Sequence, residues 1–141
     1  MWAEVEHIIQ RLVRGQDLGV TRVNEVLDAE LRLTLDTPLT RRYKATIPAG
    51  PFRDVELRVI PETGLSFLAL RANPDHPTVT NAEDLRGFGA PKWTAVEPNA
   101  PPEGKVSECY MLPGMELRVG YRAQSRLLEA VSLGQESPPG E

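Results

Sequence analysis

The feature that most constrains the fold is a short stretch in which apolar and charged residues alternate. In a β-strand, Val55-Glu-Leu-Arg-Val59 places its apolar side chains on one face and its charged side chains on the other. A second apolar stretch, residues 65–70, follows after Pro61-Glu-Thr-Gly64, whose proline and glycine suit a four-residue hairpin loop. The sequence therefore predicts an antiparallel hairpin with one buried face and one open face.

The length of the loop fixes the register of this hairpin. On the mixed face the pairs are Ile60 with Leu65, Arg58 with Phe67, and Glu56 with Ala69. The other face carries the side chains expected in the core, which are Val55, Leu57, Val59, Leu68 and Leu70. On the mixed face, Ile60, Leu65 and Phe67 then form an apolar patch among charged residues, unless a segment such as the loop 98–104 covers them.

The same stretch recurs later in the chain as Met115-Glu-Leu-Arg-Val119. Each copy follows a helix signal that begins with Val-Thr and precedes a Leu-rich strand, so the order of elements agrees in the two halves. Chance identity of four common residues is the alternative explanation. An internal duplication predicts pseudo-repeats at about 18–72 and 77–134, each a helix followed by three strands.

Three segments carry helix signals. Apolar residues recur at helical spacing over residues 2–14, and Gly15 is placed to end that helix. A second helix, "RVNEVLDA", is expected to begin with Thr21 as its N-cap. A third, short helix is expected to open with the capping box Thr80-Asn-Ala-Glu83 and to stop at Gly87.

Alternating residues and turn signals mark the remaining strands. These strands are expected at 31–36, 43–47, 106–112, 115–122 and 127–133. Residues 135–141 have the composition of a disordered tail. Residues 1–134 are therefore expected to form one α+β domain, a two-layer sandwich whose antiparallel sheet carries the helices on one face.

The second hairpin, with its turn at 113–114, raises a question of register. A two-residue turn places Glu108 opposite Val119 on the same face as Tyr110, where an unpaired buried carboxylate would be costly. Either Glu108 has a partner such as an arginine, or a longer loop shifts the register. A shift would bring Tyr110 to the open face near Trp93.

Composition and charge argue against several classes of protein. The chain is 40% hydrophobic and 26% charged, as a folded soluble domain is, and its N-terminus lacks the features of a signal peptide. We therefore expect a cytoplasmic protein without a membrane partner. A net charge of -4 argues against nucleic acid as a partner. One cysteine and two histidines do not make a metal site, and no cofactor is expected.

The candidate catalytic motifs all have structural explanations. Ser66 lacks the second glycine of a nucleophile elbow, and Cys109 is expected inside a strand as a small buried residue. The glycines of "RGFGAPK", residues 86–92, suit a helix stop and a turn better than a dinucleotide-binding fingerprint. The sequence therefore predicts a protein that is not an enzyme.

The two helix signals "VTRVNEVL" and "VTNAEDLRGFGAP" carry a resemblance to known families. Their tandem helix-and-sheet order resembles the modules of the beta-lactamase inhibitor protein and of the small outer-membrane assembly lipoproteins, in which such a helix opens each module. In size and mild acidity the chain is also similar to the small cytoplasmic immunity proteins that bacteria keep against polymorphic toxins. The resemblance implies a protein that binds and blocks without catalysis.

The leading hypothesis is a protein-binding inhibitor, an immunity protein that occludes a cognate bacterial toxin encoded nearby, and that is itself a monomer or homodimer. Its expected contact residues are Phe67, Trp93 and Tyr110 as anchors, with Arg58, Arg118 and Glu116 around them. One alternative is a small-ligand-binding or enzymatic domain with a pocket between sheet and helices, near His76, Cys109 and Arg41. Another is an oligomeric adaptor subunit that associates through an exposed strand edge.

Overall fold

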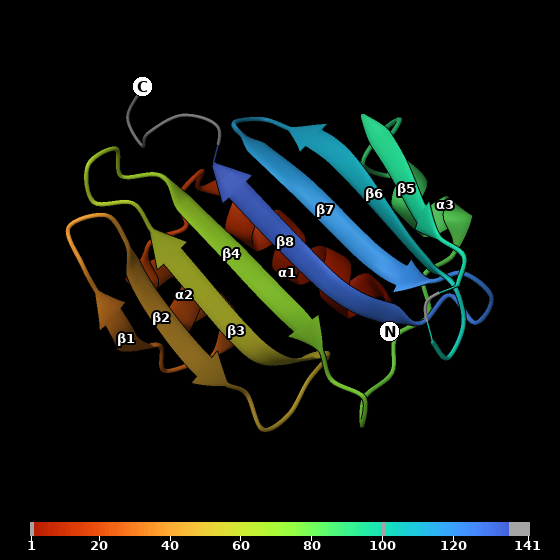
Figure 1. Ribbon diagram of the computed structural model, residues 1–141, viewed down its shortest axis with the longest axis horizontal. Helices are drawn as coiled ribbons and strands as arrows, with labels where there is room; N and C mark the ends of the chain where they lie inside the picture. Colours follow the sequence, from red (N-terminus) through yellow and green to blue (C-terminus); the bar gives the residue numbers. More distant parts are fainter. Residues whose placement is uncertain (1, 100, 136–141) are drawn as a thin grey trace.

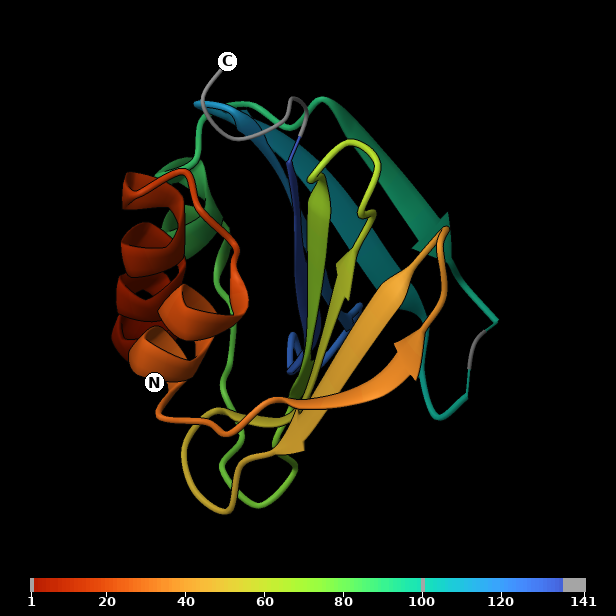
Figure 2. The same cartoon turned by 90° about the vertical axis from the view of Figure 1, so that its left-hand side faces the viewer.

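The computed structural model describes residues 2–99 and 101–135. Eight strands form one antiparallel sheet in the order β1-β2-β3-β4-β8-β7-β6-β5 (Figure 1). The strands are β1 Arg32–Asp36, β2 Arg41–Thr46, β3 Phe52–Val59, β4 Ser66–Ala72, β5 Trp93–Glu97, β6 Lys105–Leu112, β7 Met115–Arg122 and β8 Leu128–Gln135. Three helices, α1 Trp2–Arg14, α2 Val20–Leu27 and α3 Ala82–Arg86, lie on one face of the sheet (Figure 2). The fold is of the mixed α+β class.

Two four-stranded meanders make up the sheet and meet where β4 pairs with β8. In each half a helix precedes the four strands, α2 before β1 to β4 and α3 before β5 to β8. The sequence pattern missed β5, because its residues Trp93-Thr-Ala-Val-Glu97 do not alternate regularly between apolar and polar. The two copies of Glu-Leu-Arg-Val lie in β3 and β7, the third strand of each half.

The hydrophobic core lies between the helices and the sheet face that they cover. Helix α1 turns Val5, Ile9 and Leu12 toward the sheet, and all three are buried, as their helical spacing predicts. From the sheet, Leu57 and Leu117, the central residues of the two repeated stretches, are both fully buried. The repeated stretches therefore anchor both halves of the sheet to the same core.

The first hairpin forms as the sequence predicts. The Ile60 N–H donates a hydrogen bond to the Leu65 carbonyl at 2.9 Å, and Gly64 takes the left-handed conformation that a glycine tolerates. Arg58 pairs with Phe67, and the expected core residues are buried apart from Val59, which is half-buried.

The second hairpin keeps its two-residue turn, so the shifted register is wrong. Glu108 pairs with Val119 and lies on the covered face. Its carboxylate accepts one hydrogen bond from the Tyr121 hydroxyl at 2.8 Å and another from the Tyr110 hydroxyl. Two phenols, rather than an arginine, satisfy this carboxylate, which is why the tight turn is tolerated.

Two helix starts differ from the expectation. Helix α2 begins at Val20 after an N-cap at Gly19, whose N–H donates to the Asp17 side chain at 2.7 Å, so Thr21 lies inside the helix. The capping box of α3 lies one residue later than expected and joins Asn81 with Asp84. The Asn81 and Asp84 side chains thus cap the start of α3, whereas no side chain caps the first turn of α2.

The end of β8 corrects the expected tail. Gln135 is the last residue of that strand and is buried, because its side-chain oxygen accepts a hydrogen bond from the Ser66 N–H at 3.0 Å. The rest of the expected tail, residues 136–141, lies outside the described residues. Within the part of the chain that is described, the helices are too short and too polar for any of them to cross a bilayer.

Candidate functional site

The sheet face that the helices leave uncovered, here called the open face, is concave. Both edges of the sheet curl away from the helices and toward each other (Figure 2). Two hollows of about 650 and 980 Å³ lie over this face, and Glu56 and Ala69 line both of them. We call the two hollows together the trough. The larger one extends to residues 28–30, in the loop after α2.

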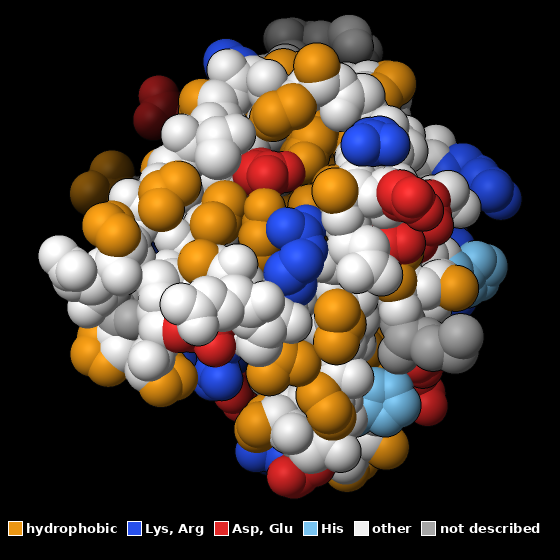
Figure 3. Space-filling view, turned by 90° about the vertical axis from the view of Figure 1, so that its right-hand side faces the viewer, with side chains coloured by type: hydrophobic (Ala, Val, Ile, Leu, Met, Phe, Trp, Pro, Cys, Tyr) orange, Lys and Arg blue, Asp and Glu red, His pale blue; other side chains and the backbone are white. Residues whose placement is uncertain are grey.

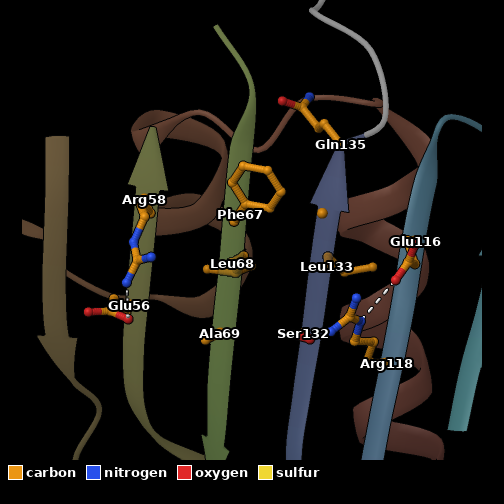
Figure 4. Close-up of a pocket in the computed structure, with 11 residues that line it drawn as sticks. Glu56, Arg58, Phe67, Leu68, Ala69, Glu116, Arg118, Ser132, Leu133 and Gln135 are labelled. Atoms are coloured by element: carbon orange, nitrogen blue, oxygen red, sulfur yellow. Dashed lines mark hydrogen bonds and ion pairs between the residues drawn. The ribbon is translucent and has the colours of Figure 1, made fainter. Parts of the chain in front are cut away.

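Small residues of the two central strands form the floor of the trough. Ala69 of β4 pairs with Ser132 of β8, and Ala130 lies farther along β8. Two larger side chains of β4 also lie on this face, Arg71 and Phe67, and Phe67 lies beside Gly134 and is 41% exposed (Figure 4). A Cβ atom at position 134 would lie 3.1 Å from Cδ1 of Phe67. Glycine at this position therefore makes room for the aromatic ring.

The two Glu-x-Arg copies flank the smaller hollow on opposite sides, one on β3 and one on β7, and are here called the walls (Figure 4). Strand register places Arg58 in the same row as Glu116, and Glu56 in the same row as Arg118. An arginine on one wall thus faces a glutamate on the other. Three inter-strand spacings separate the walls, which corresponds to about 14 Å.

Within each wall the arginine contacts the glutamate two residues before it. The distance from Arg118 Nε to Glu116 Oε1 is 2.9 Å, and this hydrogen bond lowers the pKa of the Glu116 carboxyl. On the other wall the Glu56 carboxylate lies 3.2 Å from Arg42 Nε and 3.8 Å from the Arg58 guanidinium. The Arg58 guanidinium is therefore held more loosely than that of Arg118.

The open face is basic although the chain as a whole is acidic. Strand register and ion pairs place eight basic and five acidic side chains on it, whereas the chain has 16 basic and 20 acidic residues. They are Arg32, Arg42, Lys44, Arg58, Arg71, Lys105, Arg118 and Arg122, with Asp54, Glu56, Glu97, Glu116 and Glu129. The open face therefore attracts acidic groups even though the protein carries net negative charge.

The structure brings together most of the contact residues expected from the sequence. Phe67 and the two Glu-x-Arg pairs line the trough, and Trp93 lies on the edge strand β5 at 37% exposure. The Arg118 guanidinium lies 5.4 Å from the centre of the Trp93 ring, which links β7 to that edge. Tyr110 is the exception, because it lies on the covered face and is 1% exposed. It cannot anchor a partner on the open face.

Glu103, in the loop 98–104 that was expected as a possible cover for Phe67, contacts another part of the molecule. Glu103 of that loop accepts hydrogen bonds from the Gln124 and Ser125 N–H groups at 2.8 and 2.7 Å, in the turn between β7 and β8. Phe67 is consequently left accessible at the opposite end of the central strands.

The residues expected around a pocket between sheet and helices do not converge. His76 Nε2 lies 3.2 Å from Glu4 Oε1, and Arg41 pairs with Asp36 at the far edge of the sheet. Cys109 is fully buried in β6, as expected, and burial raises the pKa of its thiol. In the described ranges no three His, Cys, Asp or Glu side chains gather as metal ligands would.

The floor residues are the part of the site that sequence reasoning missed. Ser132 and Gly134 carry no motif, and they reach the trough only because β8 inserts between β4 and β7. The pairing of β8 with β4 joins strands from the two halves of the chain, so no local sequence pattern predicts it. The one available signal was the alternation of Val131 and Leu133 with smaller residues.

Comparison with known proteins gives no relative from which a function could be carried over. No protein-family model, curated protein or solved structure matches the chain. A function for this chain therefore has to be inferred from the geometry and charge of the open face.

Proposed function

We propose that the protein is a non-catalytic binding protein whose trough holds a protruding acidic segment of a partner protein. The observation that carries this proposal is the trough itself, a concave and basic sheet face with a floor of small side chains and an accessible aromatic ring. Concave, uncovered surfaces of this composition suit protein recognition, in which aromatic and arginine side chains supply most of the binding energy.

The dimensions of the trough suit a helix or a compact loop. The strands that carry the walls are about 14 Å apart, a spacing comparable with the diameter of an α-helix with side chains, about 10–12 Å. Ala69 and Ser132 in the floor allow the backbone of such a segment to approach the sheet closely. Phe67 offers it an apolar contact, and the arginines of both walls can pair with its carboxylates.

The charges in the trough favour a protein over a nucleic acid. Glu56 and Glu116 lie among the arginines on the two walls and would repel a phosphate backbone. A protein segment can present basic groups to these glutamates and acidic groups to Arg58 and Arg118. Because each arginine lies in the same row as a glutamate of the other wall, these charges favour a partner that carries acidic and basic groups in a matching order.

An inhibitor of an enzyme is the function that we propose for this binding. A segment held in the trough would be shielded on three sides by the floor and the walls, so a partner that needs that segment for catalysis would be blocked. A toxin encoded near this protein is the partner class that we propose, which makes the chain an immunity protein.

Internal duplication is part of the same proposal, with the chain as a two-layer sandwich. It is supported by the helix-then-four-strands order of both halves and by the matching place of the Glu-Leu-Arg-Val copies in β3 and β7. A duplication would explain why the two walls carry the same residues in opposite directions. It would make the trough a product of joining the halves rather than a property of either one.

Affinity capture with matched variants tests the proposed function. The trough variant carries Arg58→Glu and Arg118→Glu, and the control carries Arg14→Glu and Arg86→Glu, which are exposed on the helices. We expect native lysate to yield one stoichiometric protein that wild type and control retain and that the trough variant binds at least about tenfold more weakly. Equal retention by all three proteins would contradict the proposal, and so would recovery of nucleic acid alone.

A further inference from the structure

The two edge strands of the sheet differ in how they are protected. Strand β1 carries a bulge between Leu33 and Leu35, and it begins and ends with a charged residue. Strand β5 pairs with β6 in an unbroken register over all five residues, and its one charged residue is Glu97 at the end. All five residues of β5 are exposed, so no described residue covers its outer edge.

An edge strand presents a row of unpaired N–H and C=O groups that another strand can bind. Proteins commonly prevent such pairing with bulges, prolines or charged residues on the edge. Strand β5 has no bulge and no proline, and its one charged residue is at its end, while Pro91 and Pro98 lie outside it on either side. Two of its side chains are exposed apolar groups, Trp93 at 37% and Val96 at 58%. Hydrophobic side chains gather on the side of the molecule formed by β5 and α3 (Figure 3).

We propose that β5 pairs antiparallel with β5 of a second copy of this chain, around a two-fold axis at Ala95. In this register Ala95 is paired with Ala95 of the second copy, and Thr94 is paired with the second copy's Val96. The exposed Val96 side chain of each copy is then partly covered by a threonine of the other copy. Trp93 faces the second copy's Glu97. No like charges are brought opposite each other, and side chains of each pair lie on the same face because β5 has no bulge.

The axis at Ala95 uses the full length of the strand. It pairs residues 93–97 with residues 97–93 of the second copy, and the prolines on either side limit the pairing to this segment. Strand pairing over five residues buries a small area, so we expect a weak dimer, in the micromolar range. The two sheets would become one, with both troughs opening on the same side. This inference does not depend on what the trough binds.

Sedimentation velocity of the full chain over a range of concentrations tests the inference. We expect a dimer whose fraction rises with concentration, and an Ala95→Lys variant that dimerises at least about tenfold more weakly because two ammonium groups meet at the axis. The matched control is Leu33→Lys on the other edge, which should dimerise as wild type does. A wild-type monomer at all concentrations would overturn the proposal, as would a dimer that Leu33→Lys weakens and Ala95→Lys does not.

Disulfide trapping gives a second test that does not rely on weakening the dimer. Ala95→Cys is made together with Cys109→Ala, because Cys109 lies on the neighbouring strand. Paired Cβ atoms across antiparallel strands are about 5 Å apart, so mild oxidation should link two copies rapidly. A Thr63→Cys variant in the exposed first hairpin loop, also with Cys109→Ala, is the control. Cross-linking of the Ala95→Cys protein no faster than that control would refute pairing at this axis.

Discussion

The covered and the open faces of the sheet are built from alternate residues of the same strands, yet the roles of their side chains depend on different features of the sequence. On the covered face Leu57 and Leu117 are fully buried, and their place in the hydrophobic core follows from their apolar character alone. On the open face Arg58 and Arg118 depend on residues from the other half of the chain for the surface that they form. Alternation therefore fixes which side becomes the core, while the shape of the open side depends on long-range pairing.

Carboxylates show the same contrast between the two faces. Glu108 is on the covered face and is held by the hydroxyls of Tyr110 and Tyr121. Glu116 is on the open face and is held by Arg118. On the covered face a neutral donor suffices, because a second charge there would have to be desolvated. On the open face a charged donor can be used, because water solvates both groups.

The largest expected effect is a difference in stability between substitutions at two adjacent residues of the second Glu-Leu-Arg-Val copy. Leu117→Ala should lower the free energy of unfolding by about 2–5 kcal/mol, because it leaves a cavity in the core. Arg118→Ala, the adjacent residue on the open face, should lower it by less than about 1 kcal/mol. Urea denaturation followed by circular dichroism measures both. Equal losses would show that the two faces do not divide core from binding surface.

A smaller effect is expected from the half-buried carboxylate of Glu108. Tyr121→Phe removes one of the hydrogen bonds to Glu108 and should lower the free energy of unfolding at neutral pH by about 1–3 kcal/mol. Phe keeps the volume of the ring, so the loss reports the missing donor. The same urea titration measures it, and a loss close to zero would mean that water replaces the hydroxyl.

Alkaline pH sharpens this prediction. Burial, followed by the hydrogen bond to Glu108, raises the pKa of both Tyr110 and Tyr121. In the unfolded chain tyrosine ionises near pH 10. Only the unfolded state then loses these protons, so stability is retained below about pH 10 and falls above it, by up to about 1.4 kcal/mol per pH unit for each tyrosine. Tyr121→Phe should reduce that slope, and an unchanged slope would contradict the assignment.

The smallest effect concerns the packing of the open face. Gly134→Ala places a methyl group against the Phe67 ring and should lower the free energy of unfolding by about 1 kcal/mol. The same change in a Phe67→Ala background should cost less, because the crowding partner is gone. Thermal denaturation of the four proteins in this cycle gives the coupling. Additive losses would indicate that the ring does not depend on the glycine.

Sequence reasoning captured the features that depend on near neighbours. The register of the first hairpin and the burial of its core side chains follow from alternation and a turn of known length, and both are confirmed. The strand β5 escaped detection because Ala95 and Val96 interrupt the alternation of apolar and polar residues, whereas the equally exposed edge strand β1 keeps that alternation and was predicted. Local pattern is therefore informative where a strand keeps a regular alternation in its sequence.

The candidate site was predictable only in part, for a related reason. Phe67, Arg58 and the pair Glu116 and Arg118 were predicted as contact residues because their own strands place them on the open face. Tyr110 was misplaced because the shifted register was meant to avoid an unpaired buried carboxylate at Glu108, and the sequence did not reveal that two tyrosine hydroxyls reach it. The floor of the trough was missed because it forms only where β4 pairs with β8, and these strands come from the two halves of the chain.

The position of β8 has a consequence for how the chain reaches its folded state. This strand is the last of the eight to be synthesised, yet it lies at the centre of the sheet and pairs on both sides. Until it has left the ribosome, β4 and β7 both remain open edges, and the two half-sheets cannot join. Such long-range pairing slows folding and leaves apolar edges exposed in the meantime. A nascent chain that pauses before β8 would therefore be at its most vulnerable to aggregation and proteolysis.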